Sequence, residues 1–130
     1  MDKKVILILI AVFTISVLGC GQSTNREILI GKYCFNRFNQ NSPKDSLFLF
    51  NDSTYIHKYW ASDAKIFDVS GHWIYNSGGQ EILFSGFKFF SDAGSRLPPG
   101  NWFSRVKISE NNEVRLMYSE ENNIYFIKVK

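Results

Sequence analysis

Side chains that could perform catalysis are few in this chain of 130 residues. Asp68, Ser70 and His72 alternate along one expected strand and are the residue types of a hydrolytic triad. Residues two apart in a strand lie about 6.6–7 Å apart and residues four apart about 13–14 Å, too far for direct hydrogen bonds. We therefore interpret the three as a solvated strand face. Because no G-x-S-x-G, G-x-G-x-x-G or Walker-type pattern occurs either, we predict that the protein is not an enzyme.

His57 and Cys34 are further residues with reactive side chains. We expect His57, which stands between Ile56 and Lys58 in a strand, to be partly exposed. Two histidines cannot alone make a transition-metal site, and no C-x-x-C or H-E-x-x-H spacing occurs, so we predict no metal and no cofactor. Cys34 lies in an apolar, aromatic stretch and is expected to be a buried, inert thiol. The alternative, a reactive or intermolecular thiol, has no nearby charge pattern to support it.

Cys20 carries the clearest chemical signal, because it ends a leader. Lys3 and Lys4 precede an apolar run over residues 5–18, and Gly19 stands just before Cys20. A charged start, an apolar stretch and a small-residue cleavage site are typical of a signal peptide. At about 1.5 Å per residue the run is about 21 Å long as a helix, short of the roughly 30 Å hydrocarbon core. The pattern therefore favours export over a membrane-spanning helix.

Val17-Leu18-Gly19-Cys20 resembles the lipobox of bacterial lipoproteins. In that family an acyl-glyceryl group is attached to the cysteine thiol, and cleavage frees the amino group for a further acyl chain such as palmitate. The resemblance implies a lipoprotein signal peptide at 1–19, lipid attachment at Cys20 and, with its polar composition, a flexible tether at 20–27. It also implies the bacterial cell envelope, at the outer membrane facing the periplasm. The alternative is ordinary secretory cleavage near Gly19, with Cys20 unmodified.

The charge and the length of the chain limit its possible partners and its number of domains. Its 15 basic and 12 acidic residues are scattered without a basic run, which argues against a nucleic-acid partner. Removal of residues 1–19 leaves a chain long enough for a single hydrophobic core, and we predict one domain at 28–130. We expect a monomer.

That domain is predicted to be all-β. Short runs of alternating apolar and polar residues are separated by Asn, Asp, Gly and Ser clusters, and no helical stripe is present. Short connections favour an antiparallel up-and-down meander, and closure of about eight strands into a small barrel would remove its exposed edges. Such a barrel encloses packed side chains or one small ligand. The expected strands are 29–36, 46–50, 54–60, 65–75, 81–84 with a further segment at 87–90, 102–108, 113–118 and 124–129.

The side chains facing the interior can be assigned in part. In the strand at 65–75, one face carries the residues expected in the core, which are Phe67, Val69, Gly71, Trp73 and Tyr75. The register of 46–60 stays open, because its first strand is apolar on both faces. A two-residue turn would pair Phe48 with Tyr55, whereas a three-residue turn would pair Leu49 with Tyr55, and the choice swaps the inward side chains.

Several short motifs are similar to those of small lipocalin-like bacterial lipoproteins. They are Gly31-Lys32-Tyr33, the hairpin Asp45 to Tyr55, Gly71-His72-Trp73 and the final Tyr125-Phe126-Ile127-Lys128. The resemblance implies a calycin-type barrel and binding of an apolar ligand.

We therefore expect a lipid-anchored, non-enzymatic binding module for an apolar or aromatic small molecule. Its lining is predicted to include five aromatic residues, namely Tyr33, Tyr55, Tyr59, Phe67 and Trp73. The loop at 91–100 is expected to cover the mouth. The alternative is an envelope protein with a solid barrel core, which binds another protein through exposed Trp60, Trp102 and Phe103.

Overall fold

The alternation of apolar and polar residues produces a barrel of short strands. The structure, a computed structural model, describes residues 25–37, 44–95 and 97–130, so Cys20 and the predicted signal peptide lie outside the described residues. In chain order the elements are η2, a 3-10 helix (Arg26–Leu29), β1 (Gly31–Phe35), β2 (Asp45–Leu49), β3 (Thr54–Trp60), β4 (Ile66–Asn76), β5 (Glu81–Phe87), β6 (Gly100–Ile108), β7 (Val114–Ser119) and β8 (Ile124–Lys128). No helix among these residues is long and apolar enough to cross a bilayer.

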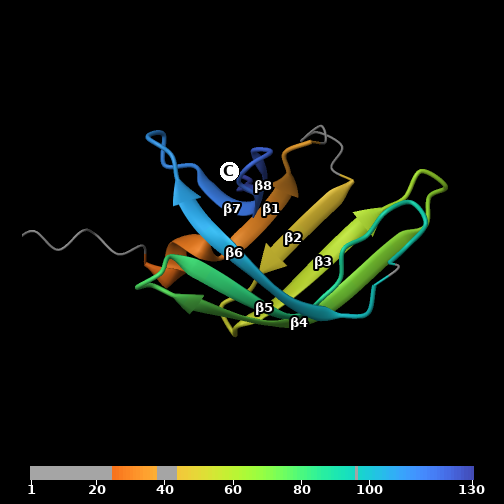
Figure 1. Cartoon of the computed structure of the whole chain (residues 1–130), viewed down its shortest axis with the longest axis horizontal. Helices are drawn as coiled ribbons and strands as arrows, with labels where there is room; N and C mark the ends of the chain where they lie inside the picture. Colours follow the sequence, from red (N-terminus) through yellow and green to blue (C-terminus); the bar gives the residue numbers. More distant parts are fainter. Residues whose placement is uncertain (1–24, 38–43, 96) are drawn as a thin grey trace, which may run out of the picture.

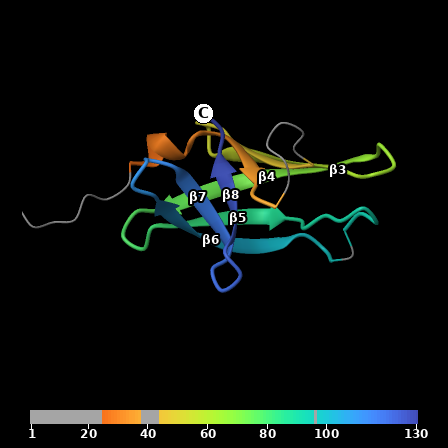
Figure 2. The same cartoon turned by 90° about the horizontal axis from the view of Figure 1, so that it is seen from above.

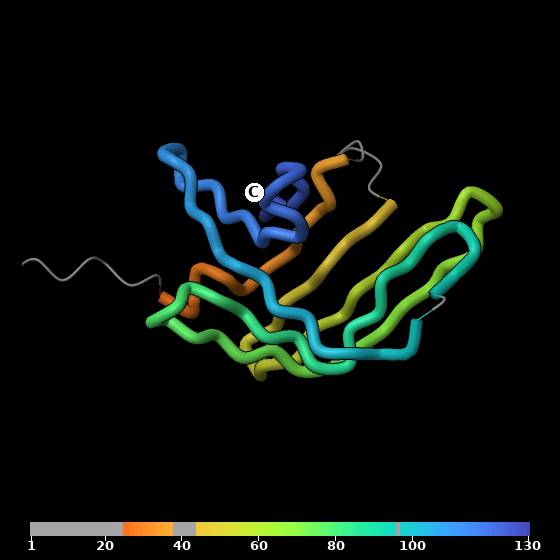
Figure 3. The backbone as a smooth tube through the Cα atoms, viewed as in Figure 1, coloured from red at the N-terminus to blue at the C-terminus, as the bar shows by residue number. Residues whose placement is uncertain are grey.

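The strands form one closed antiparallel barrel (Figure 1, Figure 2). Each strand pairs with the next along the chain, and β8 returns to pair with β1. The tube in Figure 3 shows the chain passing around the barrel in sequence order. The predicted antiparallel meander of about eight strands, closed into a small barrel, is therefore confirmed.

Several strand boundaries differ slightly from the predicted ones, and two of these differences have identifiable reasons. β1 begins at Gly31 because Leu29 belongs to η2 and is fully buried beneath it. β5 continues to Phe87, where the strand was predicted to end at Phe84, because a register shift absorbs the bend. Gly86 lies within that shift with a φ of +68°, a conformation that favours glycine. The predicted further segment at 87–90 is consequently wrong as a strand of its own.

The register between β2 and β3 follows the three-residue alternative. Leu49 pairs with Tyr55, and Phe50 and Thr54 flank the turn. The Asp52 carboxylate accepts hydrogen bonds from the backbone N–H and the hydroxyl of Thr54, which holds the turn. Tyr55 therefore faces the interior. In β4 the predicted inner face is also confirmed, since its members are each less exposed than their neighbours in the strand.

One end of the barrel is closed by η2 and the side chains beneath it. The Arg26 guanidinium lies 4.3 Å from the centre of the Trp73 ring and donates a hydrogen bond to Ser53 Oγ. The Trp73 indole N–H donates to the Phe50 carbonyl, and the Tyr33 hydroxyl donates to the Leu29 carbonyl. Packed structure thus begins within the segment predicted as a tether.

Gly71, from the Gly-His-Trp motif, has a packing role that the sequence did not reveal. A Cβ at this position would overlap the Ser85 carbonyl oxygen and lie 2.9 Å from the Tyr55 ring. The Tyr55 hydroxyl donates to that same carbonyl oxygen at 2.8 Å. The glycine therefore makes room for a buried tyrosine and its hydrogen bond.

We predict that Gly71→Ala lowers the free energy of unfolding by about 1–3 kcal/mol, because the added methyl overpacks the core against backbone. Gly100→Ala is the matched control, since a Cβ there meets open space. That control should leave the stability unchanged or raise it by up to about 1 kcal/mol. Urea unfolding followed by tryptophan fluorescence would measure both, and equal effects would contradict this role of Gly71.

Candidate functional site

The opposite end of the barrel contains a cavity of about 270 Å³. Its lining comes from the end of β1, the start of β2, β3, the segment after β5, the end of β7 and β8. The lining residues are Phe35, Arg37, Asp45, His57, Tyr59, Phe89, Phe90, Ser91, Tyr118, Ile124 and Phe126. We call this hollow the open-end cavity. The barrel is thus filled at one end and hollow at the other.

Aromatic rings form most of the cavity wall and support one another. The Tyr118 ring contacts Phe35 edge-on, with centroids 5.7 Å apart, and Phe89 in the same manner at 5.2 Å. Phe35 in turn lies 5.1 Å from Phe126. Edge-to-face and tilted pairs of this kind are the preferred arrangements of aromatic side chains. These contacts therefore hold the wall in place when no ligand is bound, and they leave ring faces and edges available to a ligand.

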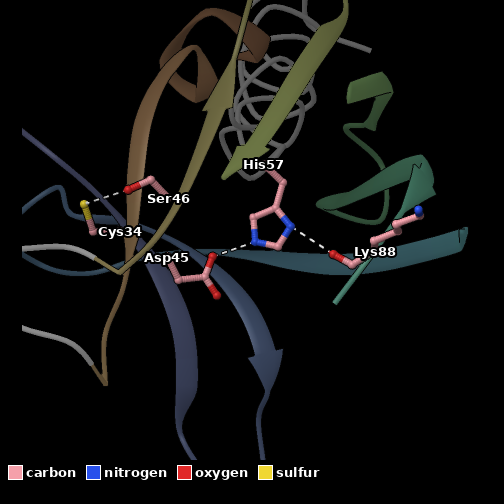
Figure 4. A network of polar contacts seen from close by, with 5 residues as sticks. All are labelled: Cys34, Asp45, Ser46, His57 and Lys88. Atoms are coloured by element: carbon pink, nitrogen blue, oxygen red, sulfur yellow. Dashed lines mark hydrogen bonds and ion pairs between the residues drawn. The ribbon is translucent and has the colours of Figure 1, made fainter. Parts of the chain in front are cut away.

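A buried histidine–carboxylate pair forms part of the lining (Figure 4). His57 Nε2 lies 2.6 Å from Asp45 Oδ1, and His57 Nδ1 lies 2.9 Å from the Lys88 carbonyl oxygen. The His57 ring is 1% exposed and stacks on Phe87 with centroids 4.7 Å apart. The expectation that His57 is partly exposed is therefore wrong. The physical reason is its parity with Tyr55 and Tyr59, which puts all three on the inner face of β3.

The hydrogen-bond partners of His57 determine where its protons lie. The Lys88 carbonyl can only accept, so Nδ1 carries a hydrogen and donates it. Nε2 lies against a carboxyl oxygen. Without a hydrogen on either atom, two acceptors would repel each other at this distance, so a second proton must lie between Nε2 and Oδ1. The pair therefore consists of an imidazolium with a carboxylate, or of an imidazole with a carboxylic acid, and is neutral overall in either form.

Asp92 ties the segment after β5 to the turn between β3 and β4. It accepts hydrogen bonds from the Tyr59 hydroxyl at 3.0 Å and from the Ser62 hydroxyl at 2.7 Å and backbone N–H at 3.1 Å. These hydrogen bonds, that from the Ser62 side chain first, lower the pKa of Asp92. Burial is the main cause that raises the pKa of Tyr59. Tyr59 thus links the cavity wall to its rim.

The five predicted lining residues separate into two groups. Tyr59 lines the open-end cavity, and half-buried Phe67 stacks on Phe90 behind the wall, with centroids 5.9 Å apart. Tyr33, Tyr55 and Trp73 are instead fully buried in the packed core toward the closed end. The prediction that these three line the cavity is wrong, because they lie deeper in the barrel. Alternation shows which face of a strand is inward but not how far along the barrel the packing is complete.

The predicted interaction surface also needs correction. Trp102 is buried and stacks on Phe84 with centroids 5.0 Å apart, whereas its neighbour Phe103 is 59% exposed. Adjacent strand residues point to opposite faces, so both could not share one surface. Trp60 is half-buried at the end of β3. Phe103 instead continues a row across the outer face, because it pairs with Leu83, which pairs with Ile74.

Other features of the described residues are less suited to a site. Cys34 is buried as predicted, with its sulfur 4.0 Å from the Ser46 hydroxyl oxygen. No group of three or more His, Cys, Asp or Glu side chains among these residues is placed to hold a metal ion. A larger hollow of about 580 Å³ lies beside Ile28, between the turn before β7 and the end of β8, and its described lining includes no aromatic ring.

Comparison with known proteins identifies the fold. The structure is similar to the crystal structure of a lipocalin-like protein from Bacteroides uniformis, with a TM-score of 0.54 and 15% sequence identity. The similarity covers 79% of this chain and 99% of that chain. No family model and no curated protein sequence matches this chain. The barrel is therefore lipocalin-like, as the sequence motifs implied.

We predict that Asp92 stabilises the folded state only while its carboxyl is ionised. Because its folded pKa is lowered, the stability difference between the wild type and Asp92→Ala should be complete above the ordinary value of 3.8. It should shrink as the pH falls through the lowered pKa. Asp68→Ala is the control, since that exposed carboxylate accepts no hydrogen bond from another described residue. Urea unfolding from neutral to acidic pH tests this, and a difference for Asp92 that is independent of pH would contradict it.

Proposed function

We propose that this lipocalin-like barrel is a lipid-anchored, non-enzymatic binding protein of the cell envelope, which holds a small apolar or aromatic molecule in the open-end cavity. The observation that carries the proposal is the aromatic cavity of about 270 Å³ at one end of a barrel whose other end is filled. Small-molecule sites are concave and mostly apolar, with a few polar groups that fix orientation. The open-end cavity has this composition.

The fixed state of His57 favours a role in binding over catalysis by this residue. His57 uses both ring nitrogens in hydrogen bonds inside the barrel, and its ring stacks on Phe87. A general base must reach the proton that it removes, and here Asp45 and the Lys88 carbonyl already occupy both nitrogens. The pair is thus suited to orienting a bound molecule.

The proposed anchor would present the cavity away from the membrane. Described structure begins at Asn25, immediately before η2 at the closed end. Five residues beyond Cys20 can span at most about 18 Å when fully extended. A lipid on Cys20 would therefore hold the closed end near the bilayer surface and leave the cavity mouth facing outward. Two or more acyl chains make such anchoring long-lived.

A second candidate function, contact with another envelope protein, has one supporting observation. Ile74 and Phe103 are 67% and 59% exposed, and Leu83 lies between them in adjacent strands. Exposed apolar rows of this kind are common in interaction surfaces. This row keeps Phe103 of the predicted set but not Trp60 and Trp102, and it is the surface that we assign to a protein partner.

We predict that 6-propionyl-2-(dimethylamino)naphthalene, an apolar dye without a hydrogen-bond donor whose emission shifts to the blue away from water, binds the purified protein, and that Ile124→Trp weakens binding at least tenfold. Ile124 lines the cavity, so a larger ring there fills the space that the dye needs. Ile74→Trp is the control, because it places the same ring on the outer face of β4. Titration with direct excitation of the dye measures both, and equal affinity in the two variants would contradict the cavity as the binding site.

We predict that the protein expressed from its full sequence in a bacterium enters the detergent phase on Triton X-114 partition, and that Cys20→Ser moves it to the aqueous phase. The substitution removes the thiol that would receive the lipid. Cys34→Ser should stay in the detergent phase, because Cys34 is buried in the barrel. Intact-mass spectrometry showing an unmodified Cys20 would overturn the anchor and leave the cavity proposal untouched.

A further inference from the structure

Asp45 has one carboxyl oxygen that the barrel does not use. Oδ1 shares a proton with His57 Nε2, whereas no donor among the described residues reaches Oδ2. The Asp45 side chain is 12% exposed and lines the open-end cavity. Figure 4 shows the second oxygen directed away from the imidazole ring. A carboxyl oxygen that the fold leaves without a donor can accept a hydrogen bond from a molecule in the cavity.

The charge around this oxygen selects a neutral donor. The His57–Asp45 pair is neutral overall because one proton lies between them, so a bound cation would be left without a counter-charge. Arg37, which lines the exposed rim, would oppose a cation further. A neutral N–H or O–H group can instead donate to Oδ2 and leave the pair balanced.

The walls around the pair select a flat ligand of small size. Phe90 lies tilted against the His57 ring with centroids 5.1 Å apart, and Phe126 meets that ring edge-on. Tyr118 and Phe89 form a further part of the wall. A planar aromatic ring gains contacts with both faces and edges of such rings, and a cavity just below the usual size range accepts one or two fused rings.

We infer that the open-end cavity binds a small planar aromatic molecule that carries one neutral hydrogen-bond donor, such as an indole or a phenol. The ring lies among the aromatic walls, and the donor hydrogen bonds to Asp45 Oδ2. His57 is a positioning residue, because it holds the carboxyl group in this orientation through Oδ1. The inference rests on the proposed function and names the ligand class of the same cavity.

Indole and benzofuran form a matched pair of probes, because oxygen replaces the N–H group in an otherwise similar bicyclic ring. Isothermal titration calorimetry of the purified protein should show indole binding at least about tenfold more tightly than benzofuran. Benzofuran offers no donor and turns an oxygen toward an oxygen, so a preference of this size reports the hydrogen bond rather than ring burial.

Two substitutions of Asp45 separate the acceptor from the rest of the side chain. In Asp45→Asn, His57 Nε2 is an acceptor, so the amide NH₂ must donate to it and the amide oxygen faces the cavity. This variant should keep the preference for indole. Asp45→Leu, of similar size, should bind both probes with affinities within about twofold of each other. Circular dichroism and the naphthalene dye, which has no donor group, verify that each variant is folded and retains its cavity.

The outcomes distinguish this inference from the proposed function. Equal binding of indole and benzofuran by the wild type would overturn the donor requirement and leave an apolar binding protein. Binding of neither, while the dye still binds, would overturn the ligand class. Loss of dye binding as well would overturn the proposed function itself. The wild-type comparison decides the matter even where Asp45→Leu fails to fold.

Discussion

The pairing of Leu49 with Tyr55 determines which side chains of β2 and β3 occupy the interior. Strand side chains alternate between faces, so a shift of one residue would turn every inward side chain of one strand outward. With the observed register, Asp45 on β2 and His57 on β3 both face inward and meet at 2.6 Å. The polar pair therefore depends on a surface turn at the far end of the same hairpin, which Asp52 holds through Thr54.

The two halves of the barrel differ in how their aromatic residues use their polar atoms. In the closed half, Tyr33, Tyr55 and Trp73 each donate a hydrogen bond to a backbone carbonyl within the fold. These bonds orient the rings and leave their apolar surfaces to fill the core, as buried tyrosine and tryptophan require. Several rings at the open end are phenylalanines, which contact one another without such fixed anchors. A cavity persists where that packing is incomplete.

The sequence could predict the barrel but only part of the site. Alternation and turn residues identified the strands and the inner face of β4, because those signals are local. The alternation also contained a clue to His57, which stands two residues from both Tyr55 and Tyr59, both taken to be inward-facing. From the sequence, Asp45 could be assigned only to a motif. Its contact with His57 could not be predicted, since His57 is twelve residues away and the contact depends on the strand register. The depth of each ring along the barrel depends on packing between distant strands, which alternation does not encode.

The combination of a buried polar pair and an unfilled space is itself an argument for binding. Apolar side chains of similar volume in place of a buried charged pair are often neutral or stabilising by about 1–4 kcal/mol. Filling a cavity of this kind with larger side chains commonly adds stability as well. At its open end this barrel has neither stabilising feature, since the polar pair is present and the cavity is unfilled. The rings at the closed end, by contrast, pack completely. Local departures from optimal packing and polarity are expected at functional sites, because a ligand completes there what the chain leaves open. The unused oxygen of Asp45 and the empty volume beside it are two parts of one such departure, and a single bound molecule would satisfy both.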